Sequence, residues 1–423
     1  MAERSAGLDQ RLILWLSLAQ LITWGSVFYT FALLMEPIER ELGLSRAESS
    51  LAFSLALLLE GFCAFPIGRL IDRGHERVVM TAGSVLVGAC LALHSVIDSQ
   101  WQFYAVWATL GLGMAATLYS PVFAIVTRRF PDQFRRAIIT MTFLGGLAST
   151  VFIPLTAWLI SEFGWRHALW VLAALQFLVC VPLHGRLLRG APAGRHTAAH
   201  HGAVAMAPPP SLGPILTSAP FLLVGVFLVL VMAVTAALPA HMVSLLRENG
   251  MSEAWAIALP ASIGVIQVLG RLLLFFFEHR FDLHTANRLI PCLMPLGLMA
   301  LLGASWWGAI PGSAGGNGSG AVFLVLLFVF LWGMGNGMLT IVRGTAMAQY
   351  VSREHVASLN GALGIPLALA RAAAPIGLGL LWSQQSGYTH GLWVLLGLSV
   401  AGVAALGLAQ RLSRQRQAPK AHA

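Results

Sequence analysis

Three ionisable side chains lie deep inside long apolar stretches of this sequence: Glu60, Arg271 and Arg371. A charge in the middle of a bilayer costs at least about 2.5 to 3.5 kcal/mol, so each of them requires a partner or a water-filled cavity. Arginine binds a carboxylate through two parallel hydrogen bonds, and a carboxyl group in an apolar setting takes up a proton readily. These residue types therefore indicate the binding of an organic anion together with the transfer of a proton.

Arg371 lies far from both ends of its apolar run. It follows Glu354 by 17 residues and precedes Trp382 by 11, too far for its side chain to reach either surface comfortably. We interpret it as a substrate contact or as one member of a gating ion pair, and the alternative is a structural arginine bound to backbone carbonyls. Small or polar residues at helical spacing give this helix one face suited to a cavity: Asn360, Gly364, Ala368 and Pro375.

Arg271 lies seven residues before Glu278, roughly 10 Å inside that charged end of its helix. Gln267 is one turn deeper on the same face. A guanidinium and an amide at these positions would hold a carboxylate. The alternative is an arginine whose side chain extends back to the membrane surface.

Glu60 lies twelve residues after Glu48 and nine before Arg69, which is near mid-depth. It would carry a proton unless a neighbouring cation keeps it ionised. His241 lies in another apolar run and belongs to the residue type that titrates near neutral pH. It is a candidate for proton coupling and for anion binding, and a neutral, hydrogen-bonded histidine is the alternative.

These side chains must be positioned by helices that cross a membrane. Apolar residues make up 57% of the 423 residues and charged residues only 10%, against roughly 25% charged residues in a soluble domain. The apolar runs are about 20 residues long, enough for a helix to cross about 30 Å of hydrocarbon, and they do not alternate as barrel strands do. The sequence predicts an all-α membrane protein with twelve transmembrane helices, near residues 12–34, 49–69, 76–97, 101–127, 137–160, 167–187, 218–246, 254–277, 288–309, 320–343, 355–382 and 389–410.

The basic residues indicate how the chain is oriented. The net charge of +9 is not gathered into one stripe of the kind that binds nucleic acid, because arginines recur in every second loop, as at Arg73, Arg128 and Arg186. The opposite loops carry few basic residues. This asymmetry follows the positive-inside rule and predicts that both termini lie in the cytoplasm.

The segment 191–217 is rich in Gly, Ala, Pro and His and is unable to bury a core, so we predict a cytoplasmic linker there. It separates an N-terminal six-helix bundle, residues 1–190, from a C-terminal one, residues 218–423. The triplet Gly-Arg-Leu ends the second span at residues 68–70 and recurs in the eighth span at residues 270–272. This repeat predicts two pseudo-symmetric bundles in which one ancestral arginine lies in a loop in one half and inside the membrane in the other.

The loop between the second and third spans carries a specific motif, Gly68-Arg69-Leu70-Ile71-Asp72-Arg73-Gly74-His75-Glu76-Arg77. It resembles the loop signature of the major facilitator superfamily of transporters. The resemblance implies the fold of that family and a conformational latch, in which Gly68 lets helices pack closely while Asp72, Arg73 and Arg77 hold the two halves together on the cytoplasmic side. A merely solvated turn is the alternative.

Further matches resemble bacterial relatives of the monocarboxylate porters, among them Gly164-Trp165-Arg166 and Asn360-Gly361-Ala362. The resemblance implies a protein of the cell inner membrane. It also implies that spans two and eleven meet at a central cavity, where Glu60 and Arg371 would pair. Spans one and ten line the same cavity in this family, which makes Tyr29 and Asn336 candidates for contact with the solute. Animal porters of this kind carry an aspartate four residues before the arginine of span eight. Here that position is Gln267, so this sequence lacks the acid that would carry the proton at that place.

Two arginines and a histidine against one carboxylate make the predicted interior basic, which favours an anionic solute. We predict a secondary transporter, not an enzyme, that moves a small organic anion such as a monocarboxylate, together with a proton, by alternating access. Two alternatives stay open: proton-driven efflux of a toxic compound, and a membrane sensor without transport. The sequence has no Gly-x-x-x-x-Gly-Lys-Ser/Thr phosphate loop, which excludes an ATP-driven pump. The expected partners are the solute, a proton and the lipid bilayer, with no cofactor, metal ion or nucleic acid.

Overall fold

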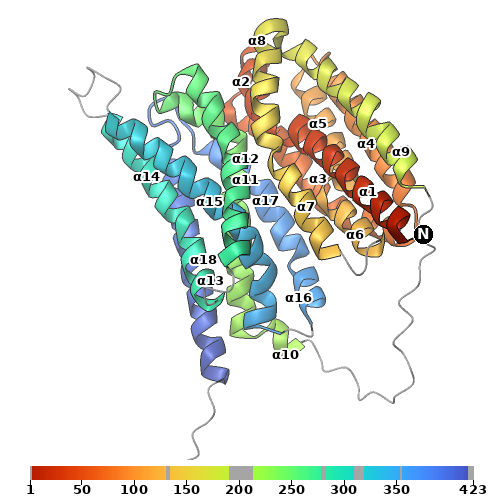
Figure 1. Ribbon diagram of the computed structural model, residues 1–423. Helices are drawn as coiled ribbons and strands as arrows, with labels where there is room; N and C mark the ends of the chain where they lie inside the picture. The colour runs from red at the N-terminus through yellow and green to blue at the C-terminus, as the bar shows by residue number, and fades with distance from the viewer. Residues whose placement is uncertain are drawn as a thin grey trace, which may run out of the picture.

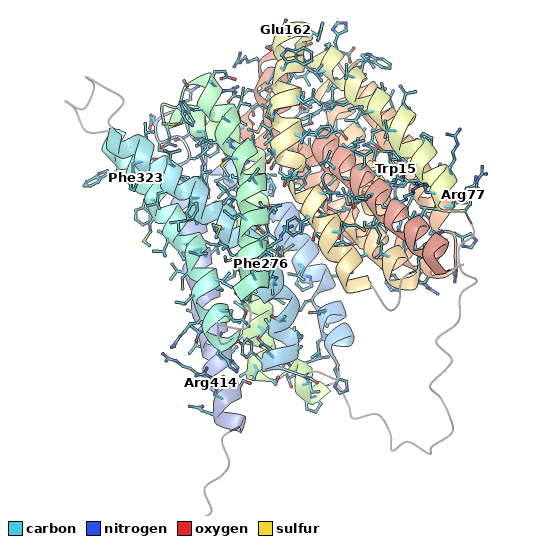
Figure 2. The ribbon with its side chains drawn as sticks, in the orientation of Figure 1. Trp15, Arg77, Glu162, Phe276, Phe323 and Arg414 are labelled. Atoms are coloured by element: carbon cyan, nitrogen blue, oxygen red, sulfur yellow. The ribbon has the colours of Figure 1, made fainter. Side chains whose placement is uncertain are left out.

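A computed structural model describes residues 2–129, 134–189, 213–277, 283–308, 319–352 and 355–417. This part of the chain is almost entirely helical and forms two bundles that lean against each other (Figure 1). We call the side where α18 ends near Arg414 the terminus side, and the side near Glu162 the far side (Figure 2). The predicted linker lies outside the described residues except for residues 213–217.

The N-terminal bundle is built from apolar helices that end at polar or glycine-containing turns. Gly43 ends one of them in a left-handed conformation, and a capping box between Ser45 and Glu48 begins the next. The helices are α1 (Ala2–Thr23), η1 (Trp24–Tyr29), α2 (Phe31–Leu42), α3 (Arg46–Asp72), α4 (Glu76–His94), α5 (Gln100–Thr117), α6 (Tyr119–Arg129), α7 (Phe134–Gly146), α8 (Ala148–Leu175), η2 (Gln176–Cys180) and α9 (Val181–Leu187).

The C-terminal bundle follows the same plan. Its first long helix is capped by Ser218, whose side chain accepts a hydrogen bond from the backbone of Phe221. The helices are α10 (Gly213–Leu216), α11 (Ala219–Glu248), α12 (Glu253–Phe277), α13 (Leu283–Leu289), η3 (Ile290–Cys292), α14 (Leu293–Gly308), α15 (Ser319–Tyr350), α16 (Val356–Ala362), α17 (Gly364–Leu380) and α18 (Thr389–Gln417).

Ten stretches of the described helices are long and apolar enough to cross a membrane, so the chain is a multi-pass membrane protein. The stretch Thr140–Leu187 contains two predicted spans, because Gly164 interrupts it with a non-helical backbone (φ 78°, ψ 161°). The predicted eleventh span is divided at Leu363 into the short helix α16 and the apolar helix α17, which is shorter than the ten spanning stretches. Every predicted span therefore lies on a helix, and the predicted fold class is confirmed.

The buried apolar residues are divided between the bundles. One cluster comes entirely from residues 221–409, and two others come almost entirely from residues 16–188. A small fourth cluster joins α2 and α8 to α11 and α12. On the outer surface, apolar side chains such as Trp15, Phe276 and Phe323 project away from the bundles, as side chains that face lipid do (Figure 2).

Each bundle contains a glycine at which two helices touch through their backbones. A Cβ atom at Gly111 of α5 would lie 2.3 Å from the carbonyl oxygen of Ala56 in α3. A Cβ atom at Gly337 of α15 would lie 2.3 Å from the carbonyl oxygen of Gln267 in α12. The two contacts are equivalent, because each joins the second and fourth spans of its bundle.

This equivalence extends to two ionisable residues. Glu60 comes four residues after Ala56, and Arg271 comes four residues after Gln267, so the two ionisable residues occupy matching positions one helical turn beyond the contact. Arg69 lies more than two turns further along α3. The Gly-Arg-Leu triplets therefore lie at different depths, and the residue of α3 that matches the position of Arg271 is Glu60, not Arg69.

The backbone contact predicts a steric effect. We expect Gly337→Ala to destabilise the protein by about 1–3 kcal/mol, the usual cost of overpacking, because the carbonyl of Gln267 yields only if α12 moves. The control is Gly407→Ala in α18, where the new Cβ would meet no atom within 4 Å. Replacing this helical glycine should stabilise by about 0.5–1 kcal/mol. Thermal unfolding of the two purified variants measures the loss of stability in Gly337→Ala and the gain in Gly407→Ala. An unchanged melting temperature for Gly337→Ala would contradict the backbone contact.

Helices α3 and α17 form the most extensive contact between the bundles. Near the far side, a Cβ atom at Gly379 would lie 2.8 Å from Oγ of Ser50, and one at Gly61 would lie 2.5 Å from Cβ of Ala368. The bundles therefore touch from the far side to mid-depth and separate toward the terminus side. The glycines of the separated part would meet no atom within 4 Å with an added Cβ: Gly68, Gly361 and Gly364.

Candidate functional site

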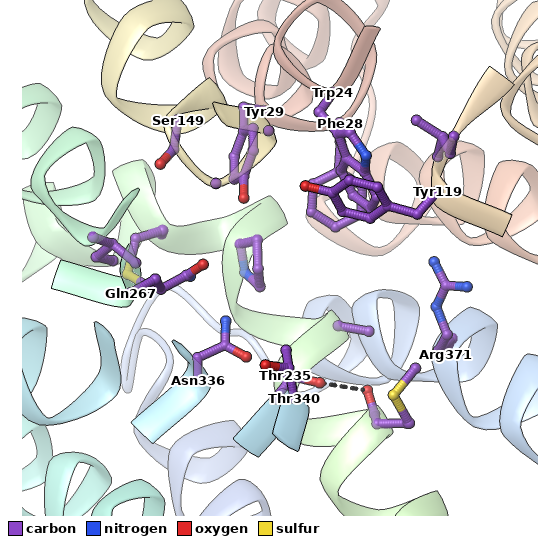
Figure 3. Close-up of a pocket in the computed structure, with 18 of the residues that line it drawn as sticks. Trp24, Phe28, Tyr29, Tyr119, Ser149, Thr235, Gln267, Asn336, Thr340 and Arg371 are labelled. Atoms are coloured by element: carbon purple, nitrogen blue, oxygen red, sulfur yellow. Dashed lines mark hydrogen bonds between the residues drawn. The ribbon is translucent and has the colours of Figure 1, made fainter. Parts of the chain in front are cut away.

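A cavity of about 330 Å³ lies between the bundles (Figure 3). Both halves of the chain line it, through η1, α3 and α6 to α8 on one side and α11, α12, α15 and α17 on the other. Its aromatic, polar and charged lining residues are Trp24, Phe28, Tyr29, Glu60, Tyr119, Ser120, Ser149, Thr235, Gln267, Arg271, Trp332, Asn336, Thr340, Arg343 and Arg371.

A π-helical turn, η1, supplies the aromatic part of the wall. The Thr30 hydroxyl donates a hydrogen bond of 2.9 Å to the carbonyl of Gly25 beside this turn. An inserted π turn re-aims the side chains around it, and such turns are frequent at functional sites. The Trp24 ring centroid lies 5.1 Å from that of Phe28 and 5.0 Å from that of Tyr119. These three rings form a continuous surface, which we call the aromatic wall.

Glu60 of α3 and Arg371 of α17 form an ion pair across the two bundles. Nη2 of Arg371 lies 2.9 Å from Oε2 of Glu60, and Nη1 lies 3.4 Å from Oε1. The side chains are 13% and 22% exposed, so the pair is largely withdrawn from solvent but still borders the cavity. The close approach of Gly61 to Ala368 brings the two helices together at this depth. The pair inferred from the sequence is thus present.

Arg271 borders the cavity without a carboxylate partner among the described residues. Its Nη1 donates a hydrogen bond of 2.8 Å to the carbonyl of Thr142, and its Nε lies 3.4 Å from the carbonyl of Gly337. Gln267, one turn away, also lines the cavity, as the sequence predicted. Backbone carbonyls orient the guanidinium but do not neutralise its charge, so it is able to bind an anion.

Arg343 of α15 is a cavity residue that the sequence analysis missed. Its Nη1 lies 2.6 Å from the sulfur of Met232, a weak acceptor that leaves its charge unbalanced. The predicted tenth span ends at residue 343, so Arg343 falls at the boundary of that span and not at mid-depth. The signal that would have found it is the helical sequence that continues to Tyr350, which places Arg343 two turns inside α15.

The described lining residues carry three guanidinium groups, from Arg271, Arg343 and Arg371, and one carboxylate, from Glu60. Their formal charges sum to 3 − 1 = +2. One neutral hydrogen-bond donor, Nε1 of Trp24, is buried there without a partner among the described residues. A buried donor without a partner costs about 1–3 kcal/mol. The cavity is therefore suited to an anion that also brings acceptor oxygens.

The remaining predicted contacts divide between two places. Tyr29 and Asn336 line the cavity, where Figure 3 shows them on opposite walls. His241 does not line it and is completely buried nearer the far side. The conformation described here therefore places His241 outside the cavity, and its contact with the solute stays a prediction.

The surroundings of His241 fit the alternative, a neutral histidine with satisfied hydrogen bonds. Its Nε2 lies 3.0 Å from the carbonyl of Pro375, which only accepts, so Nε2 carries the hydrogen. Its Nδ1 lies 3.0 Å from the hydroxyl of Tyr388, which must therefore donate. Burial raises the pKa of Tyr388, which keeps this donor protonated. Because α11 carries His241 and α3 carries Ser50, whose hydroxyl lies 3.3 Å from Nε2, the histidine helps to join the bundles.

The far side is also closed by charged side chains. Arg247 of α11 donates a hydrogen bond of 2.6 Å to Glu36 of α2, and Arg46 of α3 donates one of 2.8 Å to Ser244 of α11. Arg46 is 9% exposed and also lies over the Trp382 ring at 5.1 Å. These contacts between the bundles hold the far side shut in this conformation.

The predicted latch residues all lie on the terminus side. Asp72 and Arg73 are exposed, and within the described part of the chain neither makes an ion pair. Arg77 donates a hydrogen bond of 2.7 Å to the carbonyl of Gly185 in its own bundle. Among the described residues, no atom lies within 4 Å of a Cβ atom added at Gly68, so the close packing expected there is not seen in this part of the chain. The latch stays a prediction for a conformation closed on the terminus side.

Comparison with known protein families gives one match over most of the chain. The profile of the Major Facilitator Superfamily matches residues 16–375. Monocarboxylate transporter 13 of Rattus norvegicus is 33% identical over 115 residues, which cover 26% of this chain and 26% of that protein. The multidrug resistance protein MdtG of Yersinia enterocolitica is 27% identical over 168 residues, 37% of this chain and 40% of that protein. The matched segments thus span less than half of these relatives.

Solved structures resemble the chain over almost its full length. A point mutant of the nucleoside transporter NupG superposes with a TM-score of 0.73 at 15% identity, covering 95% of this chain and 99% of that one. A bacterial homologue of the human lysosomal transporter Spinster, in an inward-facing and unoccupied conformation, gives 0.69 at 16% identity, with coverages of 96% and 97%. At these identities the similarity shows a shared fold.

Proposed function

The chain belongs to the major facilitator superfamily of membrane transporters, and from this premise we propose that it moves a small organic anion of the monocarboxylate kind together with a proton. Family membership makes it a secondary transporter of a small solute and not an enzyme. The anionic character of the solute and the proton are the additional steps that we argue from the cavity.

The observation that carries the proposal is the excess of positive charge in the cavity. Arg271 and Arg343 have no carboxylate partner among the described residues, and their guanidinium groups are partly desolvated. An unpaired charge in such a setting is costly, and a carboxylate ligand relieves that cost by charge-assisted hydrogen bonds. A cation would meet net repulsion in the same place, so the cavity selects for anions.

The pair of Glu60 and Arg371 supplies a route for proton coupling. When a solute carboxylate approaches, Arg371 transfers its hydrogen bonds from Glu60 to the solute, and Glu60 takes up one proton from water. Solute release reverses both steps, because Glu60 loses its proton as it pairs again with Arg371. One proton and one negative charge then move together, so the solute and proton carry no net charge across.

The orientation of the protein follows from its basic loops. The terminus side carries the arginine-rich loops, and by the positive-inside rule it faces the cytoplasm of a cell whose inner membrane holds the protein. The conformation described here is then open to the cytoplasm and closed at the opposite surface. Alternating access requires a second conformation in which the contacts of Arg46 and Arg247 break and the terminus side closes.

Uptake into proteoliposomes tests the proposal. We expect a labelled monocarboxylate, from a series of increasing size, to accumulate when the medium is more acidic than the lumen and to leak back when a protonophore collapses the gradient. Imposing a membrane potential without a pH difference should not drive accumulation of the anion. If no anion accumulates while cells that express the protein resist a toxic compound, efflux by proton exchange replaces this proposal.

A further inference from the structure

The two walls of the cavity differ in chemistry. The aromatic wall, Trp24, Phe28 and Tyr119, comes from the N-terminal half, whereas Arg271 and Arg343 come from the C-terminal half. Figure 3 shows the three rings gathered together and facing Asn336 and Gln267 across the cavity. A solute that fills the cavity must therefore satisfy both the guanidinium groups and the ring surfaces.

The aromatic wall lies at the edge of the packed core, against which Trp24 and Phe28 pack while they stay partly exposed. Other rings of the same bundle, such as Phe53 and Trp107, are at most 1% exposed and pack edge-to-face on one another. Trp24, Phe28 and Tyr119 are only partly buried although they lie between the bundles, away from lipid. Ring surface left uncovered at such a place is available to a ligand, because covering it removes apolar area from water.

Two consecutive glycines place the two walls next to each other. A Cβ atom at Gly145 of α7 would lie 2.3 Å from the hydroxyl oxygen of Tyr119, and one at Gly146 would lie 3.3 Å from Nη1 of Arg271. The aromatic wall and the first cation therefore lie against adjacent residues of one helix. A ring and a carboxylate joined by one or two carbon atoms are able to reach both.

The size of the cavity agrees with a solute that has a ring. Its volume of about 330 Å³ is at the lower end of the range of about 300–1,000 Å³ that holds drug-sized ligands. A three-carbon acid bound at the arginines would leave the aromatic wall uncovered. It would also leave Nε1 of Trp24 without an acceptor, whereas an oxo or hydroxyl oxygen beside the ring would accept its hydrogen bond.

We propose that the preferred solute is an aryl-substituted carboxylate. Its carboxylate binds Arg271 and Arg343 and draws the hydrogen bonds of Arg371 away from Glu60, and its ring packs on the aromatic wall. This assignment rests on the proposed transport of organic anions and names the class of anion. The ring contributes twice, through the apolar area that it buries and through the offset or edge-to-face geometry that aromatic pairs prefer. Trp24 is the central residue of the wall because it contacts both Phe28 and Tyr119.

Equilibrium binding to the purified full-length protein tests the assignment, with pyruvate and 3-phenylpyruvate as probes that share one head group and differ by a phenyl ring. We expect 3-phenylpyruvate to bind at least about tenfold more tightly than pyruvate, a factor that corresponds to about 1.4 kcal/mol. The branched aliphatic acid 4-methyl-2-oxopentanoate should bind between the two. If it binds as tightly as 3-phenylpyruvate, the wall recognises apolar bulk and the aryl assignment fails.

Variants of two tryptophans complete the test. Trp24→Leu should weaken 3-phenylpyruvate binding about tenfold and change pyruvate binding by less than twofold. The matched control is Trp101→Leu, because Trp101 is 78% exposed at the start of α5 and should affect neither ligand. Equal affinities of the wild-type protein for pyruvate and 3-phenylpyruvate would overturn the aryl assignment and leave the anion proposal standing. Binding of the uncharged ketone 1-phenylpropan-2-one as tightly as 3-phenylpyruvate would overturn the anion proposal, and failure of every probe to bind would overturn both.

Discussion

Arg271→Gln is expected to lower proton-driven solute uptake by at least about 30-fold while leaving the protein folded. Truncating one partner of a buried, hydrogen-bonded charge pair costs about 2–5 kcal/mol, and each 1.4 kcal/mol is a factor of ten. For Arg271→Gln this cost weakens the binding of the solute and not the folding of the protein. In the empty protein the partners of Arg271 among the described residues are the carbonyls of Thr142 and Gly337, and not a carboxylate. Initial rates of uptake into proteoliposomes, at matched protein content, measure the effect.

Two further variants separate the charge of Arg271 from its shape. Arg271→Lys keeps the charge but loses the planar fork that binds a carboxylate bidentately, so we expect uptake between those of the wild-type and Arg271→Gln proteins. Arg288→Gln, at an exposed position of α13, should retain uptake within twofold. Uptake by Arg271→Gln above half of the wild-type rate would remove Arg271 from the solute site.

Glu60→Gln is expected to abolish accumulation driven by a pH gradient while exchange of labelled for unlabelled solute continues. The amide of glutamine cannot take up the proton that the pairing of Glu60 with Arg371 exchanges, but Arg371 remains available to the solute carboxylate. The ratio of internal to external solute should therefore fall to that of passive equilibration. Counterflow into preloaded proteoliposomes measures the exchange that persists, and undiminished gradient-driven accumulation would rule out Glu60 as the proton carrier.

Exchanging the two charges examines the pair itself. Removing one partner of a buried ion pair costs about 3 kcal/mol, so Glu60→Arg and Arg371→Glu should each lower the melting temperature. The double variant restores opposite charges across the same 2.9 Å contact and should recover much of the loss. A double variant that melts as low as either single one would mean that the contact adds no specific stability.

The pattern of apolar runs was enough to predict the fold, and charges inside those runs were enough to predict most of the cavity. Glu60, Arg271 and Arg371 were recognisable because an ionised group in lipid is costly, whatever the rotation of its helix. Gln267 followed from Arg271 by helical spacing alone. These inferences needed only the depth of a residue and its neighbours on one helix face.

The remaining features depend on how the helices are rotated and packed, which the sequence does not reveal. His241 lies inside an apolar run, as the arginines do, yet its ring turns toward Pro375 and Tyr388 and away from the cavity. The aromatic wall depends on the π turn at Trp24, which has no signature in the residue types. Arg343 was missed because the predicted tenth span ends at residue 343, whereas helix α15 continues to Tyr350.

The excess of positive charge in the cavity makes the movement of the carrier between its two sides sensitive to membrane voltage. An empty carrier that changes sides moves the charges of Arg271 and Arg343 through part of the electric field of the membrane. Each elementary charge that crosses a full 100 mV exchanges about 2.3 kcal/mol with that field. A bound anion cancels one of these charges and the proton on Glu60 restores it, so the loaded and the empty carrier have the same net charge and voltage acts equally on both steps. Voltage then sets how readily the carrier changes sides, loaded or empty, and not how much solute accumulates.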